Sequence, residues 1–227
     1  MRVIVALVTL LALARPAAAQ STYIGASLVG DIGRYDQVGY DDIPRPLSLA
    51  TTLDGEALGF NLRIGRELGR RWGVEFEFAR SGEMENSFSQ AMPAIRLLTS
   101  LPVIFPPLPE FEYEVETEQR HTSYGTLAWY RQSLGDTFDL TYLAGIAFTR
   151  TTIEQEVSIA DGRLAIFEGL PDSRTTMHSV APAVGAEAAF RLNESAAVTG
   201  GVRLHGSRVA GRGGWLVRPN VGVRWTF

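Results

Sequence analysis

The chain has 227 residues, of which 45% are hydrophobic, so it is long enough for one domain and short for two. Its formal net charge is −4, which gives no electrostatic case for a nucleic-acid partner. It contains no cysteine, which excludes disulfides and thiolate metal sites.

The N-terminus has the features of a secretory signal peptide. Arg2 gives it a positive start, an apolar run follows over residues 3–14, and small residues lead up to Ala19, after which we expect cleavage. The run is too short to cross a bilayer as a helix. We therefore predict an exported protein with a signal peptide over residues 1–19 and a single domain over residues 20–227.

After the signal, hydrophobicity alternates with a period of two, and helical periodicity is almost absent. An exported chain with this pattern and no further long apolar segment is either soluble or a closed membrane barrel. The predicted strands have about the length that a tilted strand needs to cross a bilayer. In chain order they cover residues 23–33, 58–65, 72–79, a segment ending near Tyr130, and residues 138–149, 180–191, 198–205 and 215–227.

Each predicted strand has an apolar or aromatic face and a face of glycine, small polar and charged residues. Phe76 and Phe78, for example, alternate with Glu75 and Glu77. The fourth strand is ambiguous, and we expect Leu127 and Trp129 to face outward. Eight stripes of bulky residues would overfill a narrow lumen, whereas the glycine-rich faces fit one. The pattern predicts an all-β fold, an eight-stranded antiparallel up-and-down transmembrane β-barrel with its apolar faces toward lipid.

The predicted connections alternate in length, as periplasmic turns and long extracellular loops do. Residues 68–71, 132–137 and 193–195 form short links, residues 34–54, 81–119 and 151–178 form long ones, and residues 206–213 an intermediate one. Aromatic residues gather at both strand ends, which predicts two interfacial girdles. The short-turn girdle would contain Tyr23, Trp72, Trp129, Tyr130, Phe138, Phe190, Trp225 and Phe227, and the opposite girdle Phe78, Phe148 and Trp215.

The last eight residues carry a motif of their own, with the polar Asn220, then Gly222, and the aromatic residues Trp225 and Phe227. This ending resembles the assembly signal of outer-membrane barrels. With the strands and the loop alternation, it makes nearly the whole mature chain similar to the OmpA/OmpX type of eight-stranded barrel. The resemblance implies that the barrel assembly machinery recognises these four residues during biogenesis.

Ten charged residues fall on the inward faces, five of each sign. In so narrow a space they must pair, because unpaired buried charges are costly. We expect Arg63 opposite Glu75, Glu187 diagonal to Arg203, and Asp31 close to Arg218 where the barrel closes. The predicted ionic network, which would leave little open pore, comprises Asp31, Arg63, Glu75, Glu77, Asp139, Glu187, Arg191, Arg203, Arg218 and Arg224.

Two further segments invite a chemical interpretation. His205 and Ser207 resemble the His-x-Ser pair of lipid A deacylases, but that family's acid lies downstream, and no Asp or Glu follows Glu194 here. We interpret His205 as an ordinary residue at a strand end. Glutamates alternate over residues 110–118, which predicts a strand continuing above the membrane and paired with residues up to about Val157. Its carboxylates form either a solvated face that protects an exposed edge or a site that gathers calcium or magnesium.

The apolar, proline-rich segment 91–109 predicts a short helix over residues 95–101 that covers the barrel mouth or contacts a partner or membrane. We expect no catalytic residue, bound metal or cofactor.

The functional hypothesis is a monomeric, non-enzymatic protein of the cell outer membrane, surrounded by lipid and lipopolysaccharide. Its role would be structural or one of surface interaction: envelope integrity, adhesion or loop-mediated binding. The alternatives are a narrow porin-like channel for small solutes and, third, a lipid A-modifying enzyme. Because barrels of one architecture serve all three roles, the hypothesis depends partly on fold analogy.

Overall fold

The computed structural model describes residues 21–35, 54–92, 111–159, 173–209 and 212–227. The predicted signal peptide and the predicted helix over residues 95–101 lie outside these ranges. The described residues form nine strands: β1 (Thr22–Tyr35), β2 (Gly55–Glu67), β3 (Trp72–Ser81), β4 (Met84–Met92), β5 (Phe111–Ser133), β6 (Phe138–Ile159), β7 (Ser173–Arg191), β8 (Ala196–Val209) and β9 (Arg212–Thr226).

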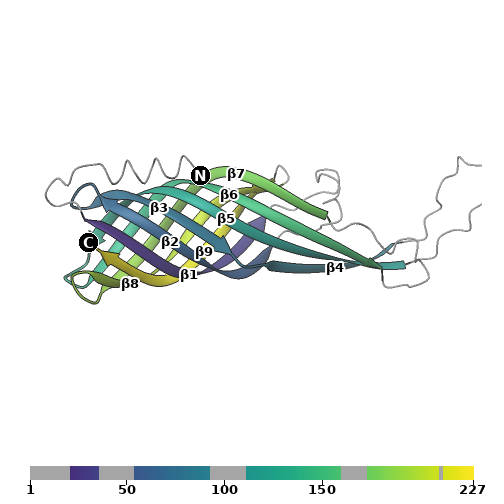
Figure 1. The fold of residues 1–227 in the computed structure, drawn as a ribbon, viewed down its shortest axis with the longest axis horizontal. Coiled ribbons are helices and arrows are strands. Elements are labelled where there is room, and N and C mark those ends of the chain that lie inside the picture. Colours follow the sequence, from purple (N-terminus) through teal and green to yellow (C-terminus); the bar gives the residue numbers. More distant parts are fainter. Residues whose placement is uncertain (1–20, 36–53, 93–110, 160–172, 210–211) are drawn as a thin grey trace, which may run out of the picture.

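The strands close into one antiparallel barrel (Figure 1). Apart from β3 and β4, each strand pairs with its neighbour in the chain, and β1 pairs with both β2 and β9. Strands β3 and β4 pair with successive parts of β5, so together they occupy one strand position in the barrel wall. With β3 and β4 counted as one, the barrel has eight strands, which confirms the predicted fold class. Among the described residues, no helix is long and apolar enough to cross a membrane.

Part of the wall extends far beyond the rest. Strands β5 and β6 have 23 and 22 residues, about twice the length needed to cross a bilayer. They stay paired up to Tyr113↔Ile159, and β4 pairs with β5 over the same stretch (Figure 1). The predicted extension of these two strands is confirmed.

Three predicted links are wrong in their bounds. Residues 151–159 and 173–178 of the predicted link 151–178 lie in β6 and β7. Much of residues 81–119, predicted as a connection, is strand, namely β4 and the first part of β5. Strands β8 and β9 stay paired up to Val209↔Arg212, so most of the predicted link 206–213 is strand as well. The opposite end has the expected short turns. The turn between β5 and β6 contains Gly135, whose positive φ of 84° suits a residue without a side chain.

The alternation places apolar side chains outside and polar ones inside. Outward residues such as Leu28 and Leu58 are 69% and 81% exposed, whereas the inward Glu77 is fully buried. The predicted facing of β5 is wrong, because Leu127 and Trp129 are buried inside the barrel. They pack in the lumen with Tyr23, Leu143, Ala147 and Ala183. This apolar cluster therefore occupies part of the interior that was expected to hold only small and polar groups.

Candidate functional site

The lumen holds nine of the ten predicted charged residues in buried positions. The strand registers explain this placement, because each of these residues lies at a position whose neighbours at i±1 face outward. The exception is Arg191, whose side chain is 41% exposed at the short-turn rim of the barrel, where it forms an ion pair with Asp139. The structure therefore places Arg191 at the mouth of the lumen and not within it.

The centre of the lumen is a cluster of two arginines and three glutamates. Arg63 forms an ion pair with Glu187 and lies 4.0 Å from Glu75. Arg203 contacts Glu77, lies 2.8 Å from Glu75, and is 3.7 Å from Glu187. The Arg203 contacts have ion-pair distances, but their alignment falls short of hydrogen-bond geometry. Charge attraction between buried groups thus holds this cluster together.

A second group joins this cluster toward the long-strand end. His205 Nε2 lies 2.9 Å from Glu77 Oε1, and Arg218 Nη1 donates to His205 Nδ1 at 3.0 Å. Arg218 also forms an ion pair with Asp31. Because an arginine donates to Nδ1, the imidazole carries its own proton on Nε2, toward Glu77. His205 thus links the central cluster to the pair that joins β9 to β1.

A third group joins the cluster toward the short turns. Arg224 Nη1 lies 3.8 Å from Glu187, and its Nη2 lies 3.9 Å from Asp139. Asp139 accepts hydrogen bonds from Arg191 at 2.6 and 2.9 Å. All ten predicted residues, together with His205, therefore belong to one chain of charged contacts that runs from Asp31 to Arg191.

Some contacts in this chain of charged residues agree with the sequence-based prediction, and others do not. Asp31 meets Arg218, and Glu187 lies diagonal to Arg203, as their strand positions indicate. The expected register of β2 and β3 is wrong, because Arg63 lies opposite Glu77 and Gly65 lies opposite Glu75. Arg63 still reaches Glu75 because arginine is long enough to span a diagonal position.

Several lumen residues were not identified from the sequence. Tyr23, predicted for a girdle, is buried, and its hydroxyl donates to Glu75 Oε2 at 2.8 Å. Above the charged chain lies a neutral polar group in which His121 contacts Gln119 at 2.9 Å and Thr151 at 3.0 Å. Inward parity could have indicated Tyr23, which shares it with Asp31. For His121, parity indicated the outer face, because the predicted facing of β5 was wrong.

The histidine and serine that resemble a deacylase pair both face the lumen. Both nitrogens of the His205 ring face partners, Glu77 and Arg218. The Ser207 hydroxyl lies 3.5 Å from the Tyr35 hydroxyl. The imidazole has no nitrogen available to accept the serine proton, which nucleophilic catalysis requires. His205 is also wrongly interpreted as an ordinary strand-end residue, because it is a fully buried part of the charged chain.

Strands β7 and β8 separate above the pair Ala183↔His205, where the hydrogen-bond ladder between them ends. Pro182, the next residue of β7, has no N–H group to donate to a ladder. A groove of about 660 Å³ lies at this point. It is bordered by outward residues such as Trp215 and by Tyr35 and Ser207, which face the lumen.

Aromatic side chains form a belt around part of the outer wall. Phe60, Phe78, Tyr124, Phe148 and His178 follow one another across five strands, with successive ring centres 5.3–6.3 Å apart. This belt contains Phe78 and Phe148 of the predicted upper girdle. At the short-turn end, Trp72, Tyr130, Phe190, Trp225 and Phe227 are exposed as predicted, whereas Tyr23 and Trp129 are inside.

The glutamates above the membrane lie on an outward face where their side chains are described. Glu116 and Glu118 are exposed, and between them Thr117 is buried. The predicted exposed edge is wrong, because β4 covers that edge of β5. Within the described part of the chain, no group of three or more histidine, aspartate or glutamate side chains is arranged to hold a metal ion.

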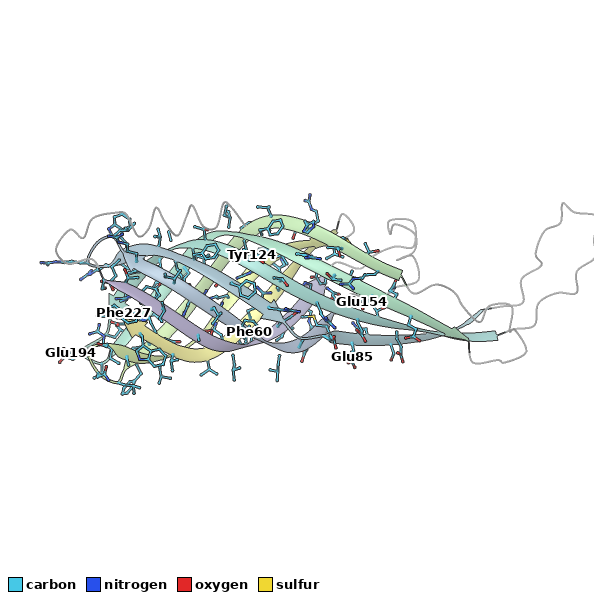
Figure 2. All side chains as sticks on the ribbon, viewed as in Figure 1. Phe60, Glu85, Tyr124, Glu154, Glu194 and Phe227 are labelled. Atoms are coloured by element: carbon cyan, nitrogen blue, oxygen red, sulfur yellow. The ribbon has the colours of Figure 1, made fainter. Side chains whose placement is uncertain are left out.

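The four residues of the C-terminal motif lie in β9 or directly after it. Trp225 and Phe227 are exposed at the short-turn end, where Figure 2 shows Phe227 opposite the extension that carries Glu85 and Glu154. The Phe227 backbone N–H donates to the Thr22 carbonyl at 2.8 Å, which fastens the end of the chain to β1. Asn220 and Gly222 lie on the inward face, opposite Val29 and Ser27 of β1.

Comparison with known proteins gives a family match over nearly the whole chain. The sequence profile described as "Outer membrane protein beta-barrel domain" matches residues 3–227. No curated protein matches the chain in sequence.

Solved structures show the same fold at low sequence identity. Neisserial surface protein A is similar with a TM-score of 0.53 and 15% identity, over 92% of this chain and 100% of that protein. Ail, the attachment invasion locus protein of Yersinia pestis, in complex with the heparin analogue sucrose octasulfate, has a TM-score of 0.50 and 14% identity, over 92% and 100%. A major outer membrane protein of Thermus thermophilus has a TM-score of 0.52 and 9% identity, again over 92% and 100%.

Proposed function

The chain belongs to the outer membrane β-barrel protein family, and from this membership we propose that it is a non-conducting barrel with a structural or surface-interaction role. It would stand in the outer membrane as a rigid support, with β4 to β7 presenting their extended ends at the cell surface. Envelope integrity, adhesion and binding through the long connections all belong to this class of role. The family itself establishes the outer membrane as its location.

The charged chain in the lumen carries this proposal. It joins residues of β1, β2, β3, β6, β7, β8 and β9, from Asp31 near the long-strand half to Arg191 at the short-turn rim. An ion crossing the lumen would have to separate several buried ion pairs, and each separation leaves an uncompensated charge. The aromatic residues Tyr23 and Trp129, with ring centres 6.2 Å apart, narrow the same part of the lumen.

The extension supports the surface role. Strands β4, β5 and β6 stay hydrogen-bonded far above the aromatic belt, so they form a defined surface instead of a loose loop. Ail, whose fold this chain shares, is named for attachment and was solved with a heparin analogue. We take from it the broad class of role and not the ligand.

Conductance in planar bilayers tests the proposal. We expect the wild-type barrel to give no steady channel openings, because the ion pairs of the lumen stay closed. A variant that removes two charges of opposite sign from the centre, Arg63→Ala/Glu187→Ala, serves as the matched control, and we expect it to conduct. Steady openings of the wild type would contradict the proposal, and a silent control variant would show that other groups close the lumen.

The runner-up is a narrow channel for small solutes. The groove between β7 and β8 favours it, because Tyr35 and Ser207 there face the lumen above the charged chain. The charged chain lies below this groove, so a complete path would also need its ion pairs to open. Liposome swelling with small sugars, measured beside the conductance, separates the two candidates. A lipid A-modifying activity ranks third, because His205 and Ser207 face the lumen and not the lipid.

We also propose that Asn220, Gly222, Trp225 and Phe227 act as a signal for the barrel assembly machinery, and that the signal peptide is cleaved after Ala19. The exposure of Trp225 and Phe227 at the short-turn end supports the first part, since a recognition factor can reach both. We propose that the mature barrel is a monomer in contact with outer-membrane lipid and lipopolysaccharide, with no nucleic-acid partner.

A further inference from the structure

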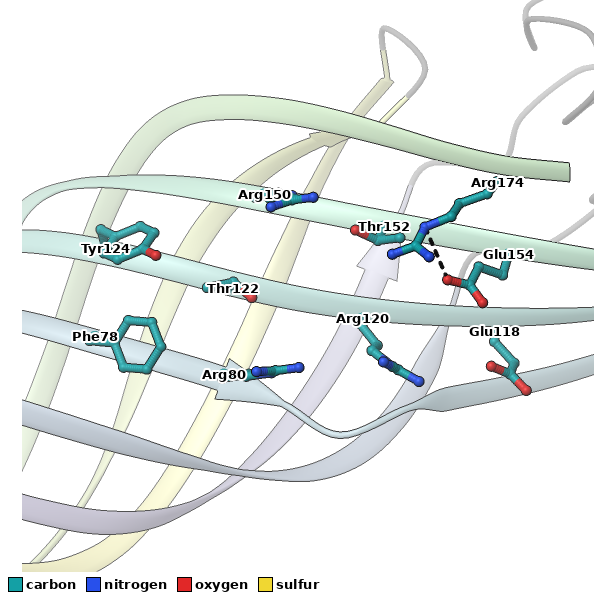
Figure 3. A pocket seen from close by; sticks show the side chains of 10 residues that line it. All are labelled: Phe78, Arg80, Glu118, Arg120, Thr122, Tyr124, Arg150, Thr152, Glu154 and Arg174. Carbon is teal, nitrogen blue, oxygen red and sulfur yellow. Dashed lines mark ion pairs between the residues drawn. The ribbon is translucent and has the colours of Figure 1, made fainter. Parts of the chain in front are cut away.

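The outer wall carries a polar groove directly above the aromatic belt. It has a volume of about 330 Å³ and lies on the outward faces of β3, β5, β6 and β7 (Figure 3). Its floor is the wall itself, and its lining contains four arginines from four strands: Arg80, Arg120, Arg150 and Arg174. This gathering of four arginines on one outward patch is unusual for the wall, which is apolar below the groove and acidic above it.

The strand registers arrange the groove in three levels. In the lowest level, Phe78, Tyr124 and Phe148 lie side by side on β3, β5 and β6. One step above, Arg80, Thr122 and Arg150 lie side by side on the same strands. Higher still, Glu85, Glu118 and Glu154 form an acidic level on β4, β5 and β6. On β3 to β6 the wall thus passes from aromatic to basic to acidic with distance from the membrane, and Arg174 of β7 lies opposite Glu154 of the acidic level.

The four arginines of the groove differ in their pairing. Arg120 forms an ion pair with Glu83, and Arg174 lies 3.2 Å from Glu154. Among the described residues, Arg80 and Arg150 form no ion pair. Figure 3 shows Arg80 at the end of β3 and Arg120 next to it on β5, with Arg150 on β6, across β5 from Arg80. The guanidinium groups of Arg80 and Arg150 are thus unpaired within the described ranges, and the hydroxyls of Thr122 and Thr152 lie between and above them. This arrangement forms a site for an oxyanion, since a guanidinium group binds two phosphate oxygens at once.

The height of the groove defines which oxyanion it meets. Aromatic belts mark the interface between the hydrocarbon of a bilayer and its head groups. The groove lies one step above the belt, on the side of the long connections, which in barrels of this class is the outer leaflet. Lipid head groups therefore face it, and the acidic level above repels phosphates that would lie higher.

The spacing of the two free arginines favours a large head group. Arg80 and Arg150 are on strands separated by one other strand, which corresponds to roughly 10 Å between their backbones. A single phosphate is small for this span, whereas a phosphorylated sugar offers phosphate oxygens to both arginines and hydroxyls to the threonines.

We propose that the groove binds the phosphorylated sugar head group of an outer-leaflet glycolipid of the lipid A class. Its acyl chains would lie along the exposed apolar wall below, past Phe78 and its neighbour Leu62 toward Ile146. Arg80 and Arg150 bind the phosphates, and the aromatic level supports the sugar from below. This site rests on membrane insertion alone, so it stands whether or not the lumen conducts.

Calorimetric titration of the refolded mature barrel in detergent micelles tests the site, with diphosphoryl lipid A as the probe. We expect Arg80→Gln/Arg150→Gln to bind at least about tenfold more weakly, since both side chains lose charge-assisted hydrogen bonds to phosphate. The matched control, Arg70→Gln/Arg71→Gln, removes two exposed arginines at the short-turn end and should bind like the wild type. Arg80→Lys/Arg150→Lys, which keeps the charge and loses the fork, should fall between them.

Three further probes define the ligand. We expect lipid A without phosphates, phosphatidylglycerol and inorganic phosphate each to bind the wild type much more weakly than diphosphoryl lipid A. Equal affinity for phosphatidylglycerol would overturn the glycolipid assignment, and equal affinity of Arg80→Gln/Arg150→Gln and wild type for lipid A would overturn the site itself. The double variant leaves the lumen unchanged, so its conductance reports on the proposed function separately.

Discussion

The inner and outer faces of the barrel wall use the same residue types under opposite conditions. On the inner face, Arg203 is buried and contacts three glutamates. On the outer face, Arg150 is exposed and, among the described residues, has no ion-pair partner. The two residues lie on strands of one sheet, but Arg203 points into the lumen and Arg150 points outward above the aromatic belt.

The difference shows that facing determines what a charge does in this fold. The lumen of an eight-stranded barrel is just wide enough for side chains, so inward charges must neutralise one another. Outward charges above the lipid keep their water and stay available for a ligand. Inner charges therefore contribute to stability, and outer charges are free to serve recognition. Substitutions at three places in the wall test this division, and they are ordered by the size of the expected effect.

Arg203→Ala should cause the largest loss. Removing this guanidinium leaves the buried Glu75, Glu77 and Glu187 close together with less positive charge to offset them. Breaking a buried ion pair in this way costs about 3–5 kcal/mol, and three carboxylates place this site at the upper end. The free energy of unfolding, measured by urea titration of the barrel in micelles, gives the loss directly.

A second variant separates charge from packing. Arg203→Ala/Glu77→Gln removes the charge of one carboxylate that the loss of Arg203 leaves uncompensated. It should recover part of the lost stability, although it deletes more of the network. A double variant as unstable as the sum of the two single variants would mean that packing, and not charge, explains the loss. The distinction between the two faces of the wall would then fail for charged residues.

Trp129 and Tyr130 extend the comparison to aromatic residues. They are neighbours in β5, with exposures of 3% and 47%. Trp129→Ala should cost about 3 kcal/mol, because it opens a cavity between Tyr23 and Leu127. Tyr130→Ala should cost clearly less, because detergent or lipid fills the space that its side chain leaves.

Fluorescence gives an independent measurement of the same prediction. The chain has four tryptophans. Trp72, Trp215 and Trp225 are exposed on the outer wall, whereas Trp129 is inside. A quencher attached to lipid tails should dim a variant that retains only an outer tryptophan, and it should leave a variant that retains only Trp129 bright. Equal quenching of both variants would contradict the position of Trp129 inside the barrel.

The fold could be predicted from the sequence because lipid and lumen make different demands on alternate residues. In β3, Phe76 and Phe78 alternate with Glu75 and Glu77, and only one orientation satisfies both environments. In β5 the same argument fails near the short turns. Leu127 and Trp129 alternate with Thr126 and Ala128, so both faces are compatible with either side, and contacts with Tyr23 and Leu143 decide.

Strand β4 was missed for a related physical reason. Above the membrane no lipid requires an apolar face, so Met84–Met92 lacks the alternation that identifies a crossing strand. What holds β4 in place is the backbone ladder to β5, which the side-chain pattern does not report.

The error in the register of β2 and β3 has a different origin. A turn centred on Gly69 would place Arg63 opposite Glu75, whereas the observed pairs Glu67↔Gly73 and Arg66↔Val74 centre the turn on Arg70. A shift of one residue in the centre of a turn moves every cross-strand pair by two. The charged residues of the candidate site could therefore be identified by parity, but their partners depended on turn geometry and on contacts across the lumen that no local pattern encodes.

Arg80→Gln/Arg150→Gln should have the smallest effect on stability. Both side chains lie on the outer face of the wall and form no ion pair with a described residue, so their loss should change the free energy of unfolding by no more than about 0.5 kcal/mol. The measurement is the same urea titration, in micelles without lipid A, so that a bound ligand does not add to the stability of the wild type. Adding lipid A should then stabilise the wild type and not the variant, because only the wild type retains the guanidinium groups. A large loss without lipid would mean that these arginines support the fold, and the outer face of the wall would share the role of the inner one.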